Sequence, residues 1–394
     1  MKYGKSGLPL SLPEDSEIEV LQKRKLPVFP DPESAVRKAL ASPLGCSSLT
    51  QEAKGCRNVC LLICDITRPV PHSVLLPILI RELLHSGFSA DAITLLVATG
   101  THRPNEGEEL RELIGDEWVF NSIPIVNHFA AREDEHVDLG TTPKGTPVKI
   151  ARRFMDADLR MVVGLVEPHF MAGYSGGRKV VVPGIAHADT IQVIHSTRML
   201  NQDEVRPGRM EGNPLHEELL QAIEKVGKIL AINTVIDQER NLSFINFGEI
   251  RESHSAAVSF ARPYFEIPVS RKFRTIVTSA SGYPLDKTYY QTIKGMMGVV
   301  DILEEGGDIF IVSECSEGLG STTYREAQTR LIQCGAEAFL AESASSTRSA
   351  MDAWETVMQI RAMKRGKVHL YSEGLNWEEK KLTGVEVIDN LTQA

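Results

Sequence analysis

The chain has 394 residues and a formal net charge of −9 at pH 7, a length above the usual size of a single core, so we expect two domains. No stretch concentrates lysine and arginine enough to follow a nucleic-acid backbone, which argues against nucleic-acid binding. The first residues lack the apolar core of a signal peptide, and no apolar run approaches the roughly 20 residues that cross a bilayer. These features predict a soluble, cytoplasmic protein without a membrane partner.

The first 30 residues are polar and interrupted by proline, and they give no firm secondary structure. From about residue 57, short apolar runs alternate with amphipathic helical patterns, which indicates an α/β fold. The strands expected in this part are 58–64, 92–98, 123–127 and 159–166. The helices expected between them are 70–86, ended by Gly87, and 106–114, ended by Gly115.

Three cysteines, Cys56, Cys60 and Cys64, recur at every fourth position, a spacing that could suggest a metal cluster. The run from Cys60 to Cys64 is otherwise Leu-Leu-Ile, so a buried strand explains these thiols better than a set of ligands.

Between residues 228 and 248, the regular alternation of strands and helices is interrupted. A helix is expected at 188–200, and a hairpin of 228–237 with 241–247 predicts an antiparallel addition to the sheet. The proline-containing stretch 261–268 marks the expected boundary between domains 1–265 and 266–394. Beyond it we expect strands 274–278, 308–313, 336–340 and 368–371, and helices 287–304 and 349–365. The predicted fold is therefore two α/β domains with mainly parallel sheets and an active-site cleft between them.

Polar side chains follow the strand 58–64 in the loop Asp65-Ile-Thr67-Arg68-Pro. The carboxyl ends of strands are where open α/β sheets bind ligands, and a carboxylate, a hydroxyl and a guanidinium together suit a nucleotide. A helix cap with a surface arginine explains the same residues equally well.

Two histidines follow the next expected strands, His102 in Gly-Thr-His-Arg-Pro and His169 in Glu167-Pro-His. A single loop histidine is more often structural, but consecutive strand ends converge on one crevice. Imidazoles at that edge can bind a metal or move protons near neutral pH.

The run Ser175-Gly176-Gly177-Arg178-Lys179 is a glycine turn that can bring backbone N–H groups and an amine close to a phosphate. It lacks the Walker spacing, which disfavours an ordinary kinase or ATPase.

Further candidates lie downstream of the turn. His187 and His195 are eight residues apart near the helix 188–200, so only one need face a site. Gln291 and Lys294 share a helix face, with Tyr290 four residues before the lysine. An amide and an ammonium suit a small carboxylate, although an exposed polar helix face is the simpler explanation of the spacing. Trp354 reads as a core residue or as the wall of a cleft.

Together, these motifs resemble the nickel-dependent lactate racemase family. Its signatures are Asp-x-Thr-Arg-Pro, Gly-Thr-His-Arg-Pro, Glu-Pro-His with a Gly-Gly-x-Lys turn, and a later Gln-x-x-Lys and tryptophan. Their order and separation match from about residue 60 to residue 360. The resemblance implies an isomerase, a racemase or epimerase of a 2-hydroxy acid, with lactate as the default substrate.

The resemblance also implies a cofactor, the nickel-pincer nucleotide (pyridinium-3-thioamide-5-thiocarboxylic acid mononucleotide), attached covalently to Lys179 and supplied by cofactor-biosynthesis proteins. By position, His195 would bind the nickel, which Lys179 would hold through the attached cofactor. The other residues that would bind the nucleotide are Asp65, Thr67, Arg68, Ser175, Gly176 and Gly177. Arg178, at the variable position, is expected to add a phosphate contact.

The implied reaction is a hydride transfer to the cofactor through a 2-keto acid, with His102 and His169 as the two acid/bases. The substrate-binding residues implied are Arg68, Tyr290, Gln291, Lys294 and Trp354.

Two other classes remain open at this point. A nucleotide- or phosphate-handling enzyme would need a carboxylate pair for a divalent metal near the turn, where only Asp65 and Glu167 are well placed. A protein that only captures a carboxylate would not need two histidines at strand ends.

Overall fold

The computed structural model describes residues 1–12, 17–345, 350 and 352–391. The chain divides into two compact units, which we call the large unit and the small unit. The large unit comprises Lys23–Ile194 and Gly208–Ile267. The small unit comprises Met1–Gln22, His195–Pro207 and Pro268–Ala394. His195 thus belongs to the same unit as the C-terminal part of the chain, and the division into domains 1–265 and 266–394 stays a prediction.

The large unit is built on a six-stranded sheet in the order β10-β9-β6-β1-β2-β3. All neighbouring pairs are parallel except β9 with β10, which is antiparallel as the hairpin pattern predicted. Every residue of β1 is buried, as expected for a central strand with packed layers on both faces. The strands are β1 (Val59–Cys64), β2 (Ile93–Ala98), β3 (Ile125–Asn127), β6 (Leu159–Leu165), β9 (Leu230–Ile236) and β10 (Leu242–Glu249).

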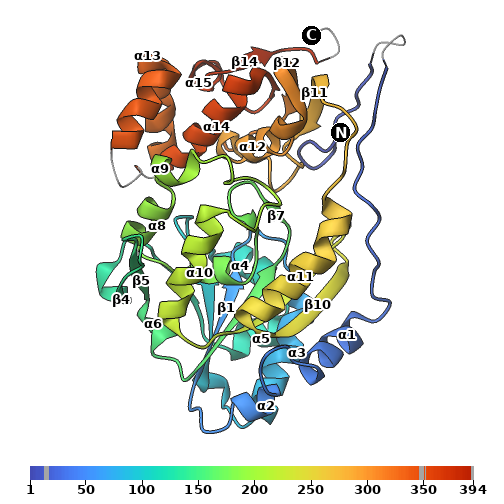
Figure 1. Ribbon diagram of the computed structural model, residues 1–394. Coiled ribbons are helices and arrows are strands. Elements are labelled where there is room, and N and C mark those ends of the chain that lie inside the picture. Colours follow the sequence, from blue (N-terminus) through green and yellow to red (C-terminus); the bar gives the residue numbers. More distant parts are fainter. Residues whose placement is uncertain (13–16, 346–349, 351, 392–394) are drawn as a thin grey trace. The chain divides into compact units, whose positions relative to one another are not determined.

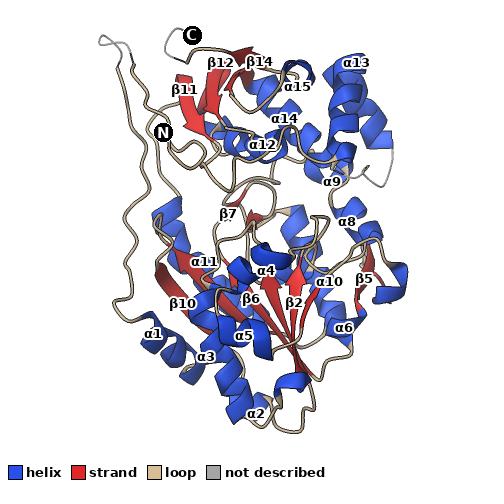
Figure 2. Cartoon of the chain, turned by 180° about the vertical axis from the view of Figure 1, so that it is seen from behind, coloured by secondary structure: helices blue, strands red, loops and turns tan. Residues whose placement is uncertain are grey.

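Helices lie on both sides of this sheet (Figure 2). α3 packs against α1, α4 and α5, whereas α7 contacts β1, β6, α10 and α11. The helices are α1 (Pro32–Ala41), α2 (Leu49–Glu52), α3 (His72–His85), α4 (Gly107–Ile114), α5 (Glu117–Ser122), α6 (Arg152–Met155), α7 (Arg178–Val181), α8 (Ala188–Ile194), α10 (Pro214–Val226) and α11 (Ile250–Phe265). Two small hairpins complete the unit, β4 (His136–Thr141) with β5 (Pro147–Ala151), and β7 (Pro168–His169) with β8 (Gly173–Tyr174).

Gly115 ends α4 as predicted, with φ of +68°. A Cβ atom at this position would lie 2.9 Å from the Cβ of Ser73 in α3, so both the backbone conformation and the packing favour glycine.

The small unit has a four-stranded, fully parallel sheet in the order β11-β12-β13-β14 (Figure 1). Its strands are β11 (Phe273–Ser279), β12 (Leu303–Val312), β13 (Gly366–Tyr371) and β14 (Glu386–Ile388). Its helices are α9 (Thr197–Leu200), α12 (Tyr289–Met297), α13 (Thr322–Ser345), α14 (Ala353–Arg365) and α15 (Trp377–Leu382).

One predicted strand is wrong, because residues 336–340 lie in α13, after a break at Gly335. A short apolar run does not separate strand from helix by itself. Within this run only Phe339 is buried, and its alanine, glutamate and leucine residues favour a helix.

Three helix boundaries also differ from the prediction. The helix expected at 287–304 ends at Met297, and the strand β12 already begins at Leu303. The helix expected at 188–200 is interrupted between Ile194 and Thr197. The helix expected at 349–365 starts at Ala353, and residue 349 lies outside the described residues.

Among the described residues, we find no helix with the length and apolar character of a membrane span.

Candidate active site

The parallel strands β1, β2 and β6 of the large unit bring three predicted loops to one edge of the sheet. β1 is paired in register with β2 on one side and with β6 on the other. Asp65 follows β1, Gly100 and His102 follow β2, and His169 follows β6. The structure therefore places the expected strand-end residues of this unit at the same edge.

Asp65 is the hydrogen-bond partner of His102. Its Oδ2 lies 2.6 Å from Nδ1 of His102, and its Oδ1 accepts from the Thr67 hydroxyl at 2.6 Å and from the Thr67 backbone N–H at 3.2 Å. Burial opposes ionisation, but the His102 charge, these hydrogen bonds and Arg68 outweigh it and hold the pKa of Asp65 below its usual value. An ionised Asp65 keeps a hydrogen on Nδ1 of His102, which leaves Nε2 as the basic atom.

Arg68 forms an ion pair with Glu167, with Nη1 of the arginine 2.5 Å from Oε1 of the glutamate. The two carboxylates that the sequence offered for a divalent metal are therefore engaged elsewhere, Asp65 with His102 and Glu167 with Arg68.

His169 is buried on the β7–β8 hairpin and stacks on Phe170, with ring centroids 4.8 Å apart. Its Nδ1 accepts hydrogen bonds from the backbone N–H groups of Met171 and Ala172, each at 3.2 Å. A nitrogen that accepts two hydrogen bonds carries no hydrogen of its own, so the neutral ring holds its hydrogen on Nε2.

The glycine turn is fixed by its own polar groups. The Ser175 hydroxyl donates to Leu165 O at 2.7 Å, and Gly177 N–H donates to Oδ1 of Asn233 at 2.9 Å. Gly176 and Gly177 have φ values of +78° and +47°. A Cβ at Gly177 would lie 2.9 Å from the His254 side chain. The turn thus requires these glycines, while contacts of Ser175, Gly176 and Gly177 with a cofactor stay a prediction.

Lys179 and Arg178 follow the turn in different environments. Lys179 is half-buried, whereas Arg178 is 1% exposed, and its guanidinium donates to Ala172 O at 2.8 Å and to Tyr174 O at 3.1 Å. The expected phosphate contact of Arg178 is therefore wrong, because its guanidinium is committed to backbone carbonyls inside the unit.

The small unit brings together the other predicted residues on α12, α14 and the segment that precedes α9. The ring of His195 lies 4.7 Å from that of Trp354, and the Trp354 indole N–H donates to the Tyr290 hydroxyl at 3.0 Å. Burial, followed by the nearby carboxylates, raises the pKa of Tyr290 well above its usual value, so the phenol stays protonated. On the same helix, the Lys294 ammonium donates to Oε1 of Gln291. The expected side-by-side placement of Gln291 and Lys294 is confirmed.

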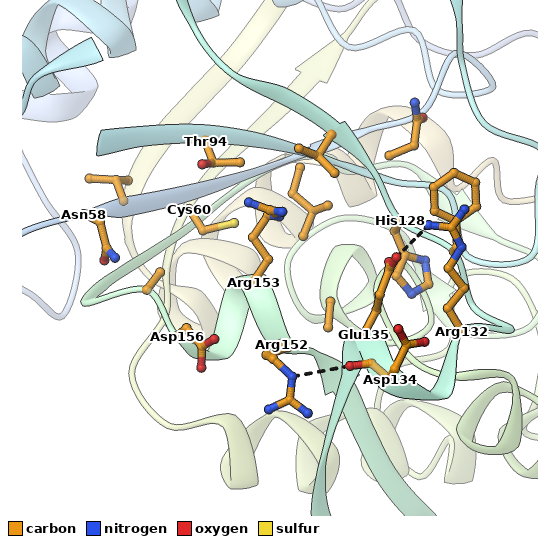
Figure 3. Close-up of a pocket in the computed structure, with 17 residues that line it drawn as sticks. Asn58, Cys60, Thr94, His128, Arg132, Asp134, Glu135, Arg152, Arg153 and Asp156 are labelled. Atoms are coloured by element: carbon orange, nitrogen blue, oxygen red, sulfur yellow. Dashed lines mark hydrogen bonds and ion pairs between the residues drawn. The ribbon is translucent and has the colours of Figure 1, made fainter. Parts of the chain in front are cut away.

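A cavity of about 460 Å³ in the large unit lies elsewhere (Figure 3). Its walls include Asn58, Cys60 and Thr94, at the beginnings of β1 and β2, together with Arg132 and Arg153. None of the predicted site residues lines it. Because parallel strands present their ligand-binding loops at the carboxyl ends, we do not assign this cavity to the active site.

A group of possible metal ligands, Glu133, His187 and Asp189, also lies in this unit. The Lys149 ammonium already contacts Glu133 at 2.7 Å and Asp189 at 2.9 Å. A lysine therefore supplies the positive charge that a cation would bring to these carboxylates.

Known proteins of one family are similar to this chain over most of its length. Residues 3–208 match the lactate racemase N-terminal domain, and residues 270–394 match the lactate racemase C-terminal domain. A lactate racemase of Thermoanaerobacterium thermosaccharolyticum is 31% identical over 384 residues, which cover 96% of this chain and 89% of that protein. A lactate racemase of Lactiplantibacillus plantarum is 35% identical over 289 residues, 73% of this chain and 67% of that protein.

Solved structures give the same result. The lactate racemase apoprotein of T. thermosaccharolyticum superimposes with a TM-score of 0.88 at 28% identity, over 99% of this chain and 92% of that chain. A protein from Thermotoga maritima, 18% identical, shares the fold with a TM-score of 0.71 over 91% of each chain. The chain therefore belongs to the lactate racemase family and is an isomerase of the racemase type.

Proposed function

We propose that this protein interconverts the two enantiomers of a small 2-hydroxy acid, with lactate as the first candidate, and that it uses a nickel-pincer nucleotide bound to Lys179. The observation that carries the proposal is a pair of histidines at one edge of the sheet whose Nδ1 atoms have different hydrogen-bond partners. His102 has its Nδ1 on Asp65, and His169 has its Nδ1 on two backbone N–H groups. The names of the similar lactate racemases support the choice of substrate.

The donor set of the strand ends fits the proposed cofactor. A half-buried amine, a guanidinium and a hydroxyl, on Lys179, Arg68 and Thr67, suit an anionic nucleotide. His195 is buried against Trp354 and offers nickel one imidazole ligand, the type of nitrogen donor that this metal accepts. When bound, the cofactor would supply the hydride-accepting centre, and the chain's own residues would handle the proton and the carboxylate.

In this proposal His102 and His169 are the acid/base pair. Nε2 of His102 takes the hydroxyl proton of the substrate, and ionised Asp65 stabilises the imidazolium that results. His169 serves the oxygen from a second direction, which inversion requires. Inversion through a 2-keto acid avoids placing a second negative charge beside the substrate carboxylate.

Arg68, Gln291 and Lys294 would bind the substrate carboxylate and oxygen, with Tyr290 and Trp354 beside them. Arginine offers a two-pronged contact to a carboxylate, and Lys294 offers an ammonium held by Gln291. The proposal requires the residues of the two units to act on one substrate, which activity measurements on variants of each set can test.

The decisive experiment is to produce the chain in a host that carries the cofactor-biosynthesis proteins. The intact mass, peptide mapping of Lys179, the nickel content and the racemisation of D- or L-lactate by chiral chromatography are then measured on one sample. We expect a mass increase on Lys179, about one nickel per chain and activity in proportion to both. Lys179→Arg is the matched control, since it keeps the charge and cannot carry the adduct. Active protein with unmodified Lys179 would refute the proposal.

A further inference from the structure

The loops that carry Asp65 and His102 are connected by the side chain of Asn105. Asp65 lies in the loop after β1 and His102 in the loop after β2, so their 2.6 Å bond depends on the distance between the two loops. Asn105 lies one residue beyond the Gly-Thr-His-Arg-Pro motif and is only 2% exposed. A buried amide needs partners for both its oxygen and its nitrogen.

The Asn105 amide has a different partner at each end. Its Oδ1 accepts from the backbone N–H of Ile66, the residue next to Asp65, at 3.3 Å. Its Nδ2 donates to Oε1 of Glu109, in the first turn of α4, at 2.5 Å. A backbone N–H can only donate and a carboxylate accepts, so these two partners determine which way the amide points.

The backbone of Asn105 is held by Asn127, the last residue of β3. Oδ1 of Asn127 accepts from the Asn105 N–H at 3.0 Å, and Nδ2 of Asn127 donates to Asn105 O at 2.8 Å. One side chain thus binds both polar groups of one backbone residue, as a paired residue does in an antiparallel sheet. Because Asn127 is paired with Val97 of β2, the central sheet itself fixes the position of Asn105.

Glu109 connects the Asn105 side chain to the residue that follows His102. Its carboxylate accepts from both Nη atoms of Arg103, at 2.6 and 2.7 Å. The His102 loop is therefore held at Arg103 and at Asn105. The Asp65 loop is bound to it at Ile66, and moving the loops apart would leave the buried Asn105 amide without its partner.

We propose that Asn105 and Asn127 are positioning residues that hold the His102 loop at the distance at which Asp65 keeps a hydrogen on Nδ1 of His102. Neither side chain touches the substrate or the cofactor in this proposal. Both act through the Asp65–His102 bond, whose strength depends on its length and direction. The inference rests on the proposed function, in which Nε2 of His102 is the base, and it adds β3 to the two strands that carry the pair.

The test follows the tautomer of His102 in the full chain without cofactor, so it does not depend on turnover. Protein labelled with ¹⁵N in histidine is studied by two-bond ¹H–¹⁵N correlation at pH 9, and His102→Gln identifies the His102 signals. In the wild-type protein we expect the form with hydrogen on Nδ1 to exceed the other at least about tenfold, because Nδ1 donates to a carboxylate.

Alanine variants test the two positioning residues. Asn105→Ala removes the bonds to Ile66 and Glu109, and Asn127→Ala removes both bonds to the Asn105 backbone. We expect each to lower the tautomer ratio at least about threefold. Asn121→Ala is the matched control, because it removes an asparagine that bonds to Glu117 four residues away, and it should leave the His102 signals unchanged.

An exchange of donor and acceptor separates positioning from a general loss of structure. Asn105→Asp keeps the acceptor for the Ile66 N–H but sets a carboxylate against Glu109, so we expect a lowered ratio. Adding Glu109→Gln supplies an amide donor to that carboxylate and should return the ratio to within about twofold of the wild-type value. In the loaded enzyme, Asn105→Ala should lower kcat about threefold to tenfold, with a smaller change in KM for lactate.

A wild-type protein with hydrogen on Nε2 of His102 would overturn the inference. The same conclusion would follow from a wild-type tautomer ratio in both folded alanine variants. If the alanine variants do not fold, equal ratios in Asn105→Asp and in the exchanged pair would count against it. Failure of the proposed function would appear separately, as full racemisation by His102→Gln in the loaded enzyme.

Discussion

The pair of Asp65 and His102 allows a quantitative prediction, tested by the substitution Asp65→Asn. The asparagine has nearly the same shape as the aspartate, and its oxygen can still accept from Thr67. Its NH₂ group would then face Nδ1 of His102, where the carboxylate accepts at 2.6 Å in the structure. His102 would have to keep its hydrogen on Nε2, the atom that we assign as the base.

The size of the effect follows from the hydrogen bond that is lost. A hydrogen bond to a charged group contributes about 1.5–3 kcal/mol. If this bond stabilises the imidazolium in the transition state, its loss lowers kcat about 10- to 150-fold. The wrong tautomer adds to this loss, so tenfold is the minimum that we expect.

The assay is the initial rate of lactate racemisation, expressed per modified Lys179 so that cofactor loading does not enter. Thr67→Val is the matched control, because it removes the 2.6 Å hydrogen bond to Asp65 and leaves the carboxylate on His102. We expect its kcat to fall only about fivefold, the effect of about 1 kcal/mol. If Asp65→Asn kept more than half of the wild-type kcat, the assignment of Asp65 and His102 would be incorrect.

Three further predictions concern binding and stability. Arg68→Lys keeps the charge but loses the two-pronged guanidinium. We therefore expect the KM for lactate to rise about tenfold, with a smaller change in kcat. An unchanged KM would exclude Arg68 from substrate binding. Trp354→Phe keeps a ring against His195 but loses the 3.0 Å hydrogen bond to Tyr290. We expect the free energy of unfolding of this variant, measured in urea, to fall by about 1 kcal/mol, and its nickel content to stay unchanged. His72 is buried with Nδ1 on Leu113 O, and burial lowers its pKa to about 4. A histidine in the unfolded chain takes up a proton near pH 6.5, whereas buried His72 stays neutral in the folded protein until the pH falls much lower. The free energy of unfolding is therefore highest above pH 6.5, and the His72 effect lowers it by about 2 kcal/mol between pH 7.5 and 5. His72→Gln should flatten this pH dependence, and equal slopes for the two proteins would contradict it.

The sequence by itself determined the central sheet of the large unit and the loops at its edge. The runs 58–64, 92–98 and 159–166 are mostly apolar, as is typical of parallel strands that are buried on both faces between two layers of helices. Once such strands are recognised, the motifs that follow them must lie at the same edge. The positions of His102 and His169 could therefore be predicted without coordinates.

Tertiary structure alone decided which groups are paired. Asp65 and His102 are 37 residues apart, and either could have faced a nucleotide instead. Arg178 looked like a phosphate ligand beside the glycine turn, but the carbonyls that bind it belong to a loop that folds beneath it. Asn127 carries no short motif that relates it to the His102 loop. Hydrogen-bond partners of this kind depend on the packing of segments that are distant in the sequence. Strand burial, by contrast, can be predicted from the local pattern of apolar residues.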